Sequence, residues 1–172
     1  MRFNYYHRLT RRQQGIYRKS DSIVAVPIPD GAPLVPIVSG INAFLMTEDR
    51  AGTQSASQAL VNELTRRFAV PAITVAVLAT RPVLRDGGDL YGLYEPAERG
   101  KPITLSVWMR TSQRKKVVAF RTFLRTLIHE FCHHLDYEFF KLAETFHTAG
   151  FYQRESSLMR QLLEQRDSSD TR

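Results

Sequence analysis

Cysteine is nearly absent from this 172-residue sequence, which contains only Cys132. A lone cysteine cannot form a disulfide within the chain and cannot furnish a zinc module built from several cysteines. This excludes the disulfide-stapled small secreted domains and makes the cytosol the expected compartment. Cys132 shares a predicted helix face with Ile128 and Leu135, so we expect a buried thiol and not a nucleophile.

Long apolar runs are also missing. No segment approaches the ~20 consecutive apolar residues that a membrane-spanning helix needs, and the first residues lack the apolar stretch of a signal peptide. We therefore expect no contact with a membrane. With 43% hydrophobic and 24% charged residues, the sequence has the composition of a single globular domain. It contains no glycine-rich phosphate-binding loop and no internal repeat.

Acidic residues are missing from two stretches. Residues 1–20 carry six basic residues and no acidic one, which accounts for nearly all of the net charge of +7. Residues 110–125 form a second basic stretch without acids. Such clusters are typical of nucleic-acid contacts and equally of solvated surfaces. The candidate nucleic-acid contacts in the first stretch are Arg8, Arg11, Arg12, Arg18 and Lys19.

Four of the eight prolines lie between residues 27 and 36, where they favour extended backbone. We therefore predict a basic arm and a proline-rich tether over residues 1–40. The folded domain is expected over 41–166, and a serine-rich, charged tail over 167–172 is expected to fray.

Hydrophobic periodicity predicts an α+β fold in the remainder of the chain. Strict alternation over residues 103–109 indicates a half-buried strand, which we place at the edge of a short mixed or antiparallel sheet. The two strands before it are expected to form a hairpin or meander. The predicted helices cover about 54–68, 117–142 and 148–165, and the predicted strands cover 73–79, 90–94 and 103–109.

The long helix over 117–142 contains an HExxH motif, His129-Glu130-Phe131-Cys132-His133. Residues four apart lie on the same helix face, so the two histidines can direct neutral imidazole nitrogens at one metal ion. The carboxylate of Glu130, next to the first histidine, can reach a water molecule at the fourth metal position. The motif therefore predicts a zinc site with Glu130 as the catalytic base.

A catalytic zinc site usually has a third protein ligand, and three residues compete for this place. His147 follows His133 by fourteen residues, which allows the chain to fold back over the metal, and it is the favoured ligand. Glu155 is the alternative. Asp136 shares the His129 face but lies too far along a straight helix axis to join both histidines.

Other side chains near the motif are candidates for supporting roles. Arg154 lies seven residues after His147, where it could pair with Asp136, help to bind a carbonyl oxyanion or form an ordinary surface ion pair. Tyr152 could also donate a hydrogen bond to the oxyanion.

The spacing of these residues resembles that of the SprT-like metalloproteases, including the Spartan and WLM groups. The similarity covers about residues 103–160 and rests on His129-Glu130-x-x-His133 followed by His147-Thr148-Ala149-Gly150-Phe151. It implies a compact zincin fold, in which a third histidine opens the helix after the HExxH helix and an aromatic residue packs that helix. Thr148 stands where glycine commonly follows the third histidine.

Motif and resemblance together predict a zinc metallopeptidase that uses one Zn²⁺ and acts on a peptide or protein. Glu130 would activate the zinc-bound water and later return a proton to the leaving amine. An extended substrate could add to the predicted edge strand. The residues expected along this substrate are Ile103, Leu105, Val107 and Trp108.

Two other functions remain open. The chain could be a nucleic-acid- or protein-binding module whose zinc site is structural or inactive, with the basic arm as its working part. It could also hydrolyse a non-peptide amide, because the HExxH chemistry does not distinguish between amides.

Overall fold

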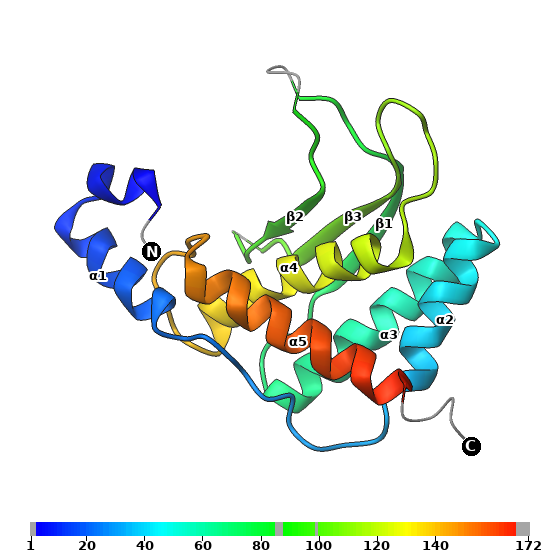
Figure 1. The fold of residues 1–172 in the computed structure, drawn as a ribbon, viewed down its shortest axis with the longest axis horizontal. Coiled ribbons are helices and arrows are strands. Elements are labelled where there is room, and N and C mark those ends of the chain that lie inside the picture. The colour runs from blue at the N-terminus through cyan, green and yellow to red at the C-terminus, as the bar shows by residue number, and fades with distance from the viewer. Residues whose placement is uncertain (1–2, 85–87, 99, 168–172) are drawn as a thin grey trace.

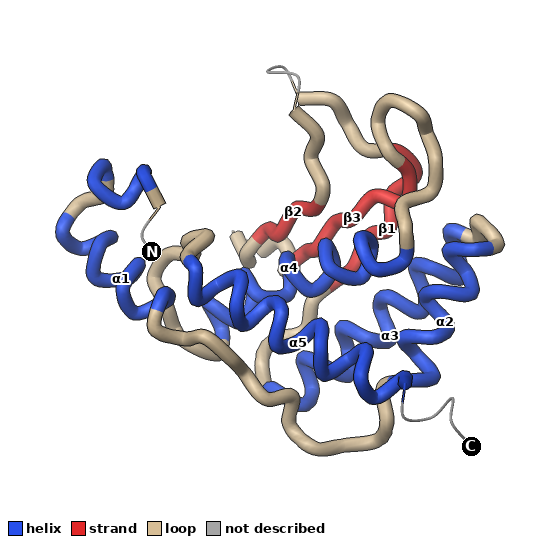
Figure 2. The backbone as a smooth tube through the Cα atoms, in the orientation of Figure 1, coloured by secondary structure: helices blue, strands red, loops and turns tan. Residues whose placement is uncertain are grey.

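The computed structural model describes residues 3–84, 88–98 and 100–167. In these residues five α-helices, one short 3₁₀ helix and a small three-stranded sheet form an α+β fold, which confirms the predicted class. In Figure 2 the strands lie together on one side of the helices. The elements are η1 (Asn4–Arg8), α1 (Arg11–Asp21), α2 (Val35–Met46), α3 (Arg50–Phe68), β1 (Thr74–Thr80), β2 (Gly92–Glu95), β3 (Thr104–Arg110), α4 (Phe120–Glu138) and α5 (Ala149–Asp167).

The sheet order β1-β3-β2 contradicts the prediction that residues 103–109 form an edge strand. β3 is the central strand and pairs in parallel with β1 and antiparallel with β2. β1 and β2 flank β3, so they do not form the predicted hairpin. Alternation reports which face of a strand is buried but not whether both of its edges are paired, which is why the sequence pattern misplaced this strand.

The outer edge of β1 is closed by two glutamines of α3. Gln58 accepts a hydrogen bond from the backbone N–H of Val75 at 2.8 Å and donates one to the carbonyl of Ile73 at 2.9 Å. One turn earlier, Gln54 bonds in the same way to the N–H of Val77 and the carbonyl of Val75, each at 2.6 Å. The side-chain amides thus replace a neighbouring strand, and a further strand cannot pair here.

The helix that carries the motif ends earlier than predicted. α4 ends at Glu138, whereas the periodicity predicts helix as far as residue 142. After Phe139 the chain turns through Lys141, whose φ is 53°, and the N–H of Leu142 bonds to the carbonyl of Asp136. This turn starts the loop that brings residues 143–148 back beside α4.

The N-terminal segment differs from the predicted arm and tether. Thr10 and Gln13 form a capping box at the start of α1, and Tyr17 and Ser20 of this helix are fully buried. α2 begins at Val35 and runs through the predicted boundary at residue 40. Pro36 occupies its first turn, where a proline is tolerated because that N–H has no partner within the helix.

α4 lies at the centre of the molecule, where it contacts the sheet, α2 and α5 (Figure 1). Its apolar residues, including Leu124, Leu127 and Phe131, are buried in the main core. Cys132 is fully buried, as predicted. The helices in the described ranges include none long and apolar enough to cross a membrane. Of the predicted tail, residues 168–172 lie outside the described residues and Asp167 ends α5.

Candidate metal centre

Three histidine side chains converge from two parts of the chain. His129 and His133 lie one turn apart on α4, and His147 lies in the loop just before α5. The Nε2 atom of His147 is 3.0 Å from that of His129 and 3.1 Å from that of His133. The three nitrogens all lie within 4.8 Å of one another.

The two distances from His147 are close to those of a tetrahedral zinc site. Two nitrogens bound at about 2.05 Å to a tetrahedral zinc ion lie roughly 3.3 Å apart. The spacing of 3.0–3.1 Å in the structure is close to that value. Three histidines would leave a fourth position for water or substrate, as in catalytic zinc sites.

The hydrogen bonds on the far side of two rings direct lone pairs into the centre. The Nδ1 atom of His129 lies 2.8 Å from a carboxylate oxygen of Glu155, so this nitrogen carries the hydrogen. Thr145 donates its only hydroxyl hydrogen to Asp136 at 2.7 Å, so its oxygen accepts from Nδ1 of His133 at 2.8 Å. In the neutral rings both Nε2 atoms are then unprotonated.

His147 cannot satisfy both of these lone pairs, because its Nε2 atom carries at most one hydrogen. At least one of the two short nitrogen contacts therefore lacks a shared hydrogen. A cation between the three nitrogens removes this conflict, so the donor set fits a metal ion such as Zn²⁺.

Two of the three histidines, His133 and His147, are held in the neutral form that binds a metal. Burial lowers the pKa of His133 to about 3 and lowers the pKa of His147, and the neighbouring His129 acts in the same direction on both. Lowered values keep these rings neutral at physiological pH. Phe151 packs beside the cluster, with its ring 4.8–5.2 Å from the three imidazole rings.

Glu155 and Tyr5 support the cluster from the periphery. Glu155 on α5 is nearly fully buried and bonds to Arg125 at 2.6 Å as well as to His129. The hydroxyl of Tyr5, in η1, donates to the backbone carbonyl of His147 at 2.8 Å. The N-terminal segment therefore contacts the loop that carries the third histidine.

Glu130 lies beside the cluster and beneath β2. Its side chain is buried against Gly92, where an added Cβ atom would overlap the carboxylate. Burial raises the pKa of Glu130 to about 7, although the backbone N–H of Tyr94 and the nearby His129 act in the opposite direction. A carboxylate with such a pKa can both accept and return a proton near neutrality.

The cluster forms the floor of an open cleft of about 800 Å³. Residues 89–94, which include most of β2, form one wall, and α4 and the start of α5 form the other. The cleft reaches the histidines and Glu130, and its walls include the side chains of Tyr91, Tyr137 and Tyr152. Its residues are thus suited to contact apolar and aromatic groups.

The structure separates the competing ligands of the sequence analysis. His147 joins the two motif histidines, whereas Glu155 bonds to the outer nitrogen of His129 and Asp136 forms a buried ion pair with Arg154 at 2.6 Å. Burial raises the pKa of Asp136, while the guanidinium of Arg154 and the hydroxyl of Thr145 act to lower it.

The supporting candidates are placed at different depths. Arg154 is fully buried and does not line the cleft, so it cannot reach an oxyanion there. Tyr152 is 41% exposed at the cleft wall, with its ring 5.8 Å from that of His147. The prediction that a substrate adds along residues 103–109 is wrong, because the central strand is already paired on both sides. The four residues expected to contact the substrate are buried on or beside this strand: Ile103, Leu105, Val107 and Trp108. The basic residues of the N-terminal segment are exposed: Arg8, Arg11, Arg12, Arg18 and Lys19.

The sequence did not predict several residues that support the site, namely Tyr5, Gly92, Tyr94, Arg125 and Thr145. The glycine gives a signal that could have been used, because glycine inside a strand often marks a close approach. Thr145 gives none, since its contacts depend on how the loop folds back onto α4.

Comparison of the chain with protein-family models, with curated proteins and with solved structures gave no match.

Proposed function

We propose that this protein is a zinc-dependent metallopeptidase of the cytosol, in which His129, His133 and His147 bind one Zn²⁺. The observation that carries the proposal is the convergence of three imidazole Nε2 atoms beside the buried carboxylate of Glu130 on the floor of a cleft. Three histidines with access to a fourth position are typical of hydrolytic zinc sites. The resemblance of the motif to SprT-like metalloproteases supports the same function.

The side chains of the centre have distinct tasks in this proposal. When bound, zinc makes water acidic and stabilises negative charge on the scissile carbonyl oxygen. Glu130 accepts a proton from the attacking water at its carboxylate and returns it to the leaving amine. Glu155 and Thr145 hold the Nδ1 atoms of His129 and His133, which fixes the orientation of both rings. Tyr152 is the candidate hydrogen-bond donor to the oxyanion.

The proposed substrate is an extended peptide segment lying along β2. The side chains of α3 close the outer edge of β1, and β3 is paired on both sides. β2 is the other outer strand of the sheet, and it borders the cleft next to Glu130. Backbone pairing with β2 would bring a peptide bond to the centre, and the exposed Tyr91 and Leu93 would contact its side chains.

The decisive experiment separates metal binding from chemistry. Glu130→Gln keeps the shape of the side chain but cannot accept the proton, so we expect zinc content to be unchanged and peptide cleavage to fall by at least ~10²-fold. Glu138→Gln on the same helix is the matched control and should cleave as the wild type does. Cleavage would be followed by mass spectrometry on a peptide mixture. Equal cleavage by wild type and Glu130→Gln would refute the proposed role of Glu130.

The rival function is a binding module with a structural or inactive zinc site. Nucleic acid would then contact the exposed basic residues of η1 and α1, of which Arg11 and Arg12 lie at the start of α1. This function predicts that Glu130→Gln changes nothing measurable. Hydrolysis of small amides without cleavage of any peptide would favour the non-peptide amide as substrate.

A further inference from the structure

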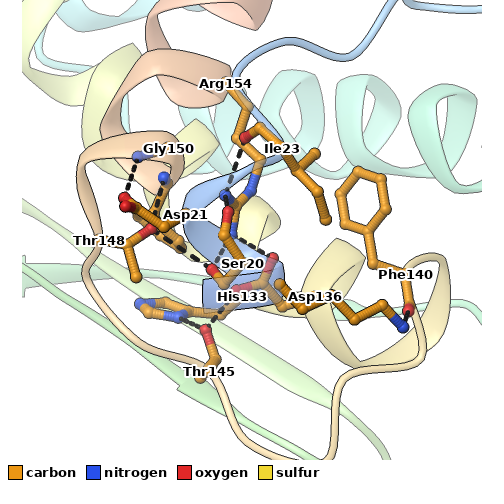
Figure 3. Close-up of polar contacts among 12 residues, drawn as sticks. Ser20, Asp21, Ile23, His133, Asp136, Phe140, Thr145, Thr148, Gly150 and Arg154 are labelled. Carbon is orange, nitrogen blue, oxygen red and sulfur yellow. Dashed lines mark hydrogen bonds and ion pairs between the residues drawn. The ribbon is translucent and has the colours of Figure 1, made fainter. Parts of the chain in front are cut away.

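Arg154 is the largest fully buried side chain of the described residues, and its hydrogen bonds lead in two directions. Toward the metal centre, its guanidinium donates to one carboxylate oxygen of Asp136 at 2.6 Å. The other oxygen of Asp136 accepts from the hydroxyl of Thr145 at 2.7 Å, and the Thr145 oxygen accepts from Nδ1 of His133 at 2.8 Å. Figure 3 shows this chain of contacts.

In the other direction, Arg154 bonds to the end of α1. The guanidinium donates to the carbonyl of Ser20 at 2.9 Å, to the hydroxyl of Ser20 at 3.0 Å and to the carbonyl of Ile23 at 3.2 Å. Carbonyl groups at a helix C-terminus carry partial negative charge and favour a cation. The end of α1 therefore holds one side of the guanidinium, while Asp136 holds the other (Figure 3).

The end of α1 is itself locked onto the start of α5. The N–H of Gly150 bonds to the carboxylate of Asp21 at 3.1 Å, and the hydroxyls of Ser20 and Thr148 lie 3.4 Å apart. A Cβ atom at Gly150 would collide with the backbone of Asp21, so only glycine permits this close approach. These contacts begin at Thr148, the residue after His147, and leave the end of α1 little freedom to move.

We propose that Arg154 is a positioning residue that couples the end of α1 to His133, fixing the Nδ1–H tautomer of this ring and aiming its Nε2 atom at the metal. This inference rests on the proposed zinc centre and goes beyond it, because it makes residues 10–23 part of that centre. Arginine is suited to the task, since its planar group serves several acceptors on two sides at once. A lysine at this position would carry the same charge but would lack the planar guanidinium with its several hydrogen-bond donors.

The first test interrupts the relay, that is, the chain of hydrogen bonds from Arg154 through Asp136 and Thr145 to His133, at the Thr145 hydroxyl. Thr145→Val keeps the branched shape but removes the hydroxyl between His133 and Asp136, and Thr145→Ser restores it. Thr47→Val, at the exposed end of α2, is the matched control, because its hydroxyl bonds only to carbonyls of its own helix. We expect Thr145→Val to weaken zinc binding by about 10–100-fold in competition with a chelator, with Thr145→Ser and Thr47→Val near the wild type.

The second test asks whether Arg154 acts through the same path. Arg154→Lys should weaken zinc binding and shift the visible absorption bands of the Co²⁺-substituted protein in the same direction as Thr145→Val does. The double variant should bind zinc about as tightly as the weaker single variant, because the two changes break one chain of contacts. Additive losses in log affinity would contradict the coupling.

The tautomer of His133 can be read in the metal-free protein from the ¹⁵N chemical shifts of its ring. We expect the Nδ1–H tautomer in the wild type and a mixture of tautomers in Thr145→Val and Arg154→Lys. An unchanged tautomer in both variants would overturn the proposal, even if both variants were less stable to urea. This readout needs no zinc, so it tests the relay separately. If the wild type contained no zinc but the tautomers were as expected, the relay would stand and the proposed metallopeptidase would be refuted.

Discussion

Gly92→Ala is expected to displace Glu130 without touching the metal ligands. A Cβ atom at Gly92 would lie 2.7 Å from Cγ and 2.8 Å from Cδ of Glu130. Carbon atoms pack at about 3.5–4.0 Å, so the Glu130 side chain must move by roughly 1 Å. The backbone of Gly92 does not have a positive φ, so alanine adds no strain of its own there.

A displacement of this size has a measurable effect on catalysis. Misplacement of a reacting group by about 1 Å can lower the rate ~10²-fold, so we expect kcat/KM for peptide cleavage to fall by about this factor. Crowding should also lower the free energy of unfolding by about 1–3 kcal/mol. Zinc content should remain at the wild-type level, because the new methyl group points at Glu130 and not at a histidine.

The assay compares zinc content and peptide cleavage for Gly92→Ala and for Gly15→Ala. An added Cβ atom at Gly15, on α1, meets no atom within 4 Å, which makes it a matched control with wild-type activity. Full activity of Gly92→Ala would refute the inference that the position of Glu130 under β2 matters. Loss of zinc would show that the change acts through the ligands instead.

Three further predictions concern parts of the structure around the centre. Glu155→Ala should still bind one zinc ion, because it removes the hydrogen-bond partner of His129 Nδ1 and not a metal ligand. Its zinc affinity in competition with a chelator should be about 10–100-fold lower, and complete loss of zinc would make Glu155 a ligand. Gln58→Ala should lower the free energy of unfolding by about 1–3 kcal/mol in urea, since Val75 and Ile73 lose their partners at the edge of β1, and an unchanged value would show that water replaces the amide. If nucleic acid binds to α1, replacing both Arg11 and Arg12 by alanine should lower the slope of log affinity against log salt by up to about 2, measured by fluorescence anisotropy; an unchanged slope would place the contacts elsewhere.

The sequence could predict the parts of the molecule that depend on local patterns. The helical period around His129 and His133 indicates the face that carries both side chains, and the spacing to His147 favours the histidine that the structure brings beside them. The α+β class follows from the change between helical and alternating periods. These features need no knowledge of how distant segments pack.

The parts of the fold that were not predicted depend on pairing between distant segments, or on local sequence signals that also fit another structure. The alternation of residues 103–109 does not show that β3 is paired on both sides. Thr10 and Gln13 were an available capping-box signal for α1, and Pro36 marks the first turn of α2 although a cluster of prolines also fits a tether. The relay through Thr145 joins residues from three separate elements or loops, so no local pattern contains it.

The zinc content of the purified protein shows whether His129, His133 and His147 together bind a metal ion. We expect one zinc ion per chain in the wild type and in His7→Ala, which changes an exposed histidine of η1 that is not one of the three clustered histidines. His147→Ala should lose most of the zinc, measured by inductively coupled plasma mass spectrometry against protein concentration. One zinc ion per chain in His147→Ala would contradict the three-histidine centre.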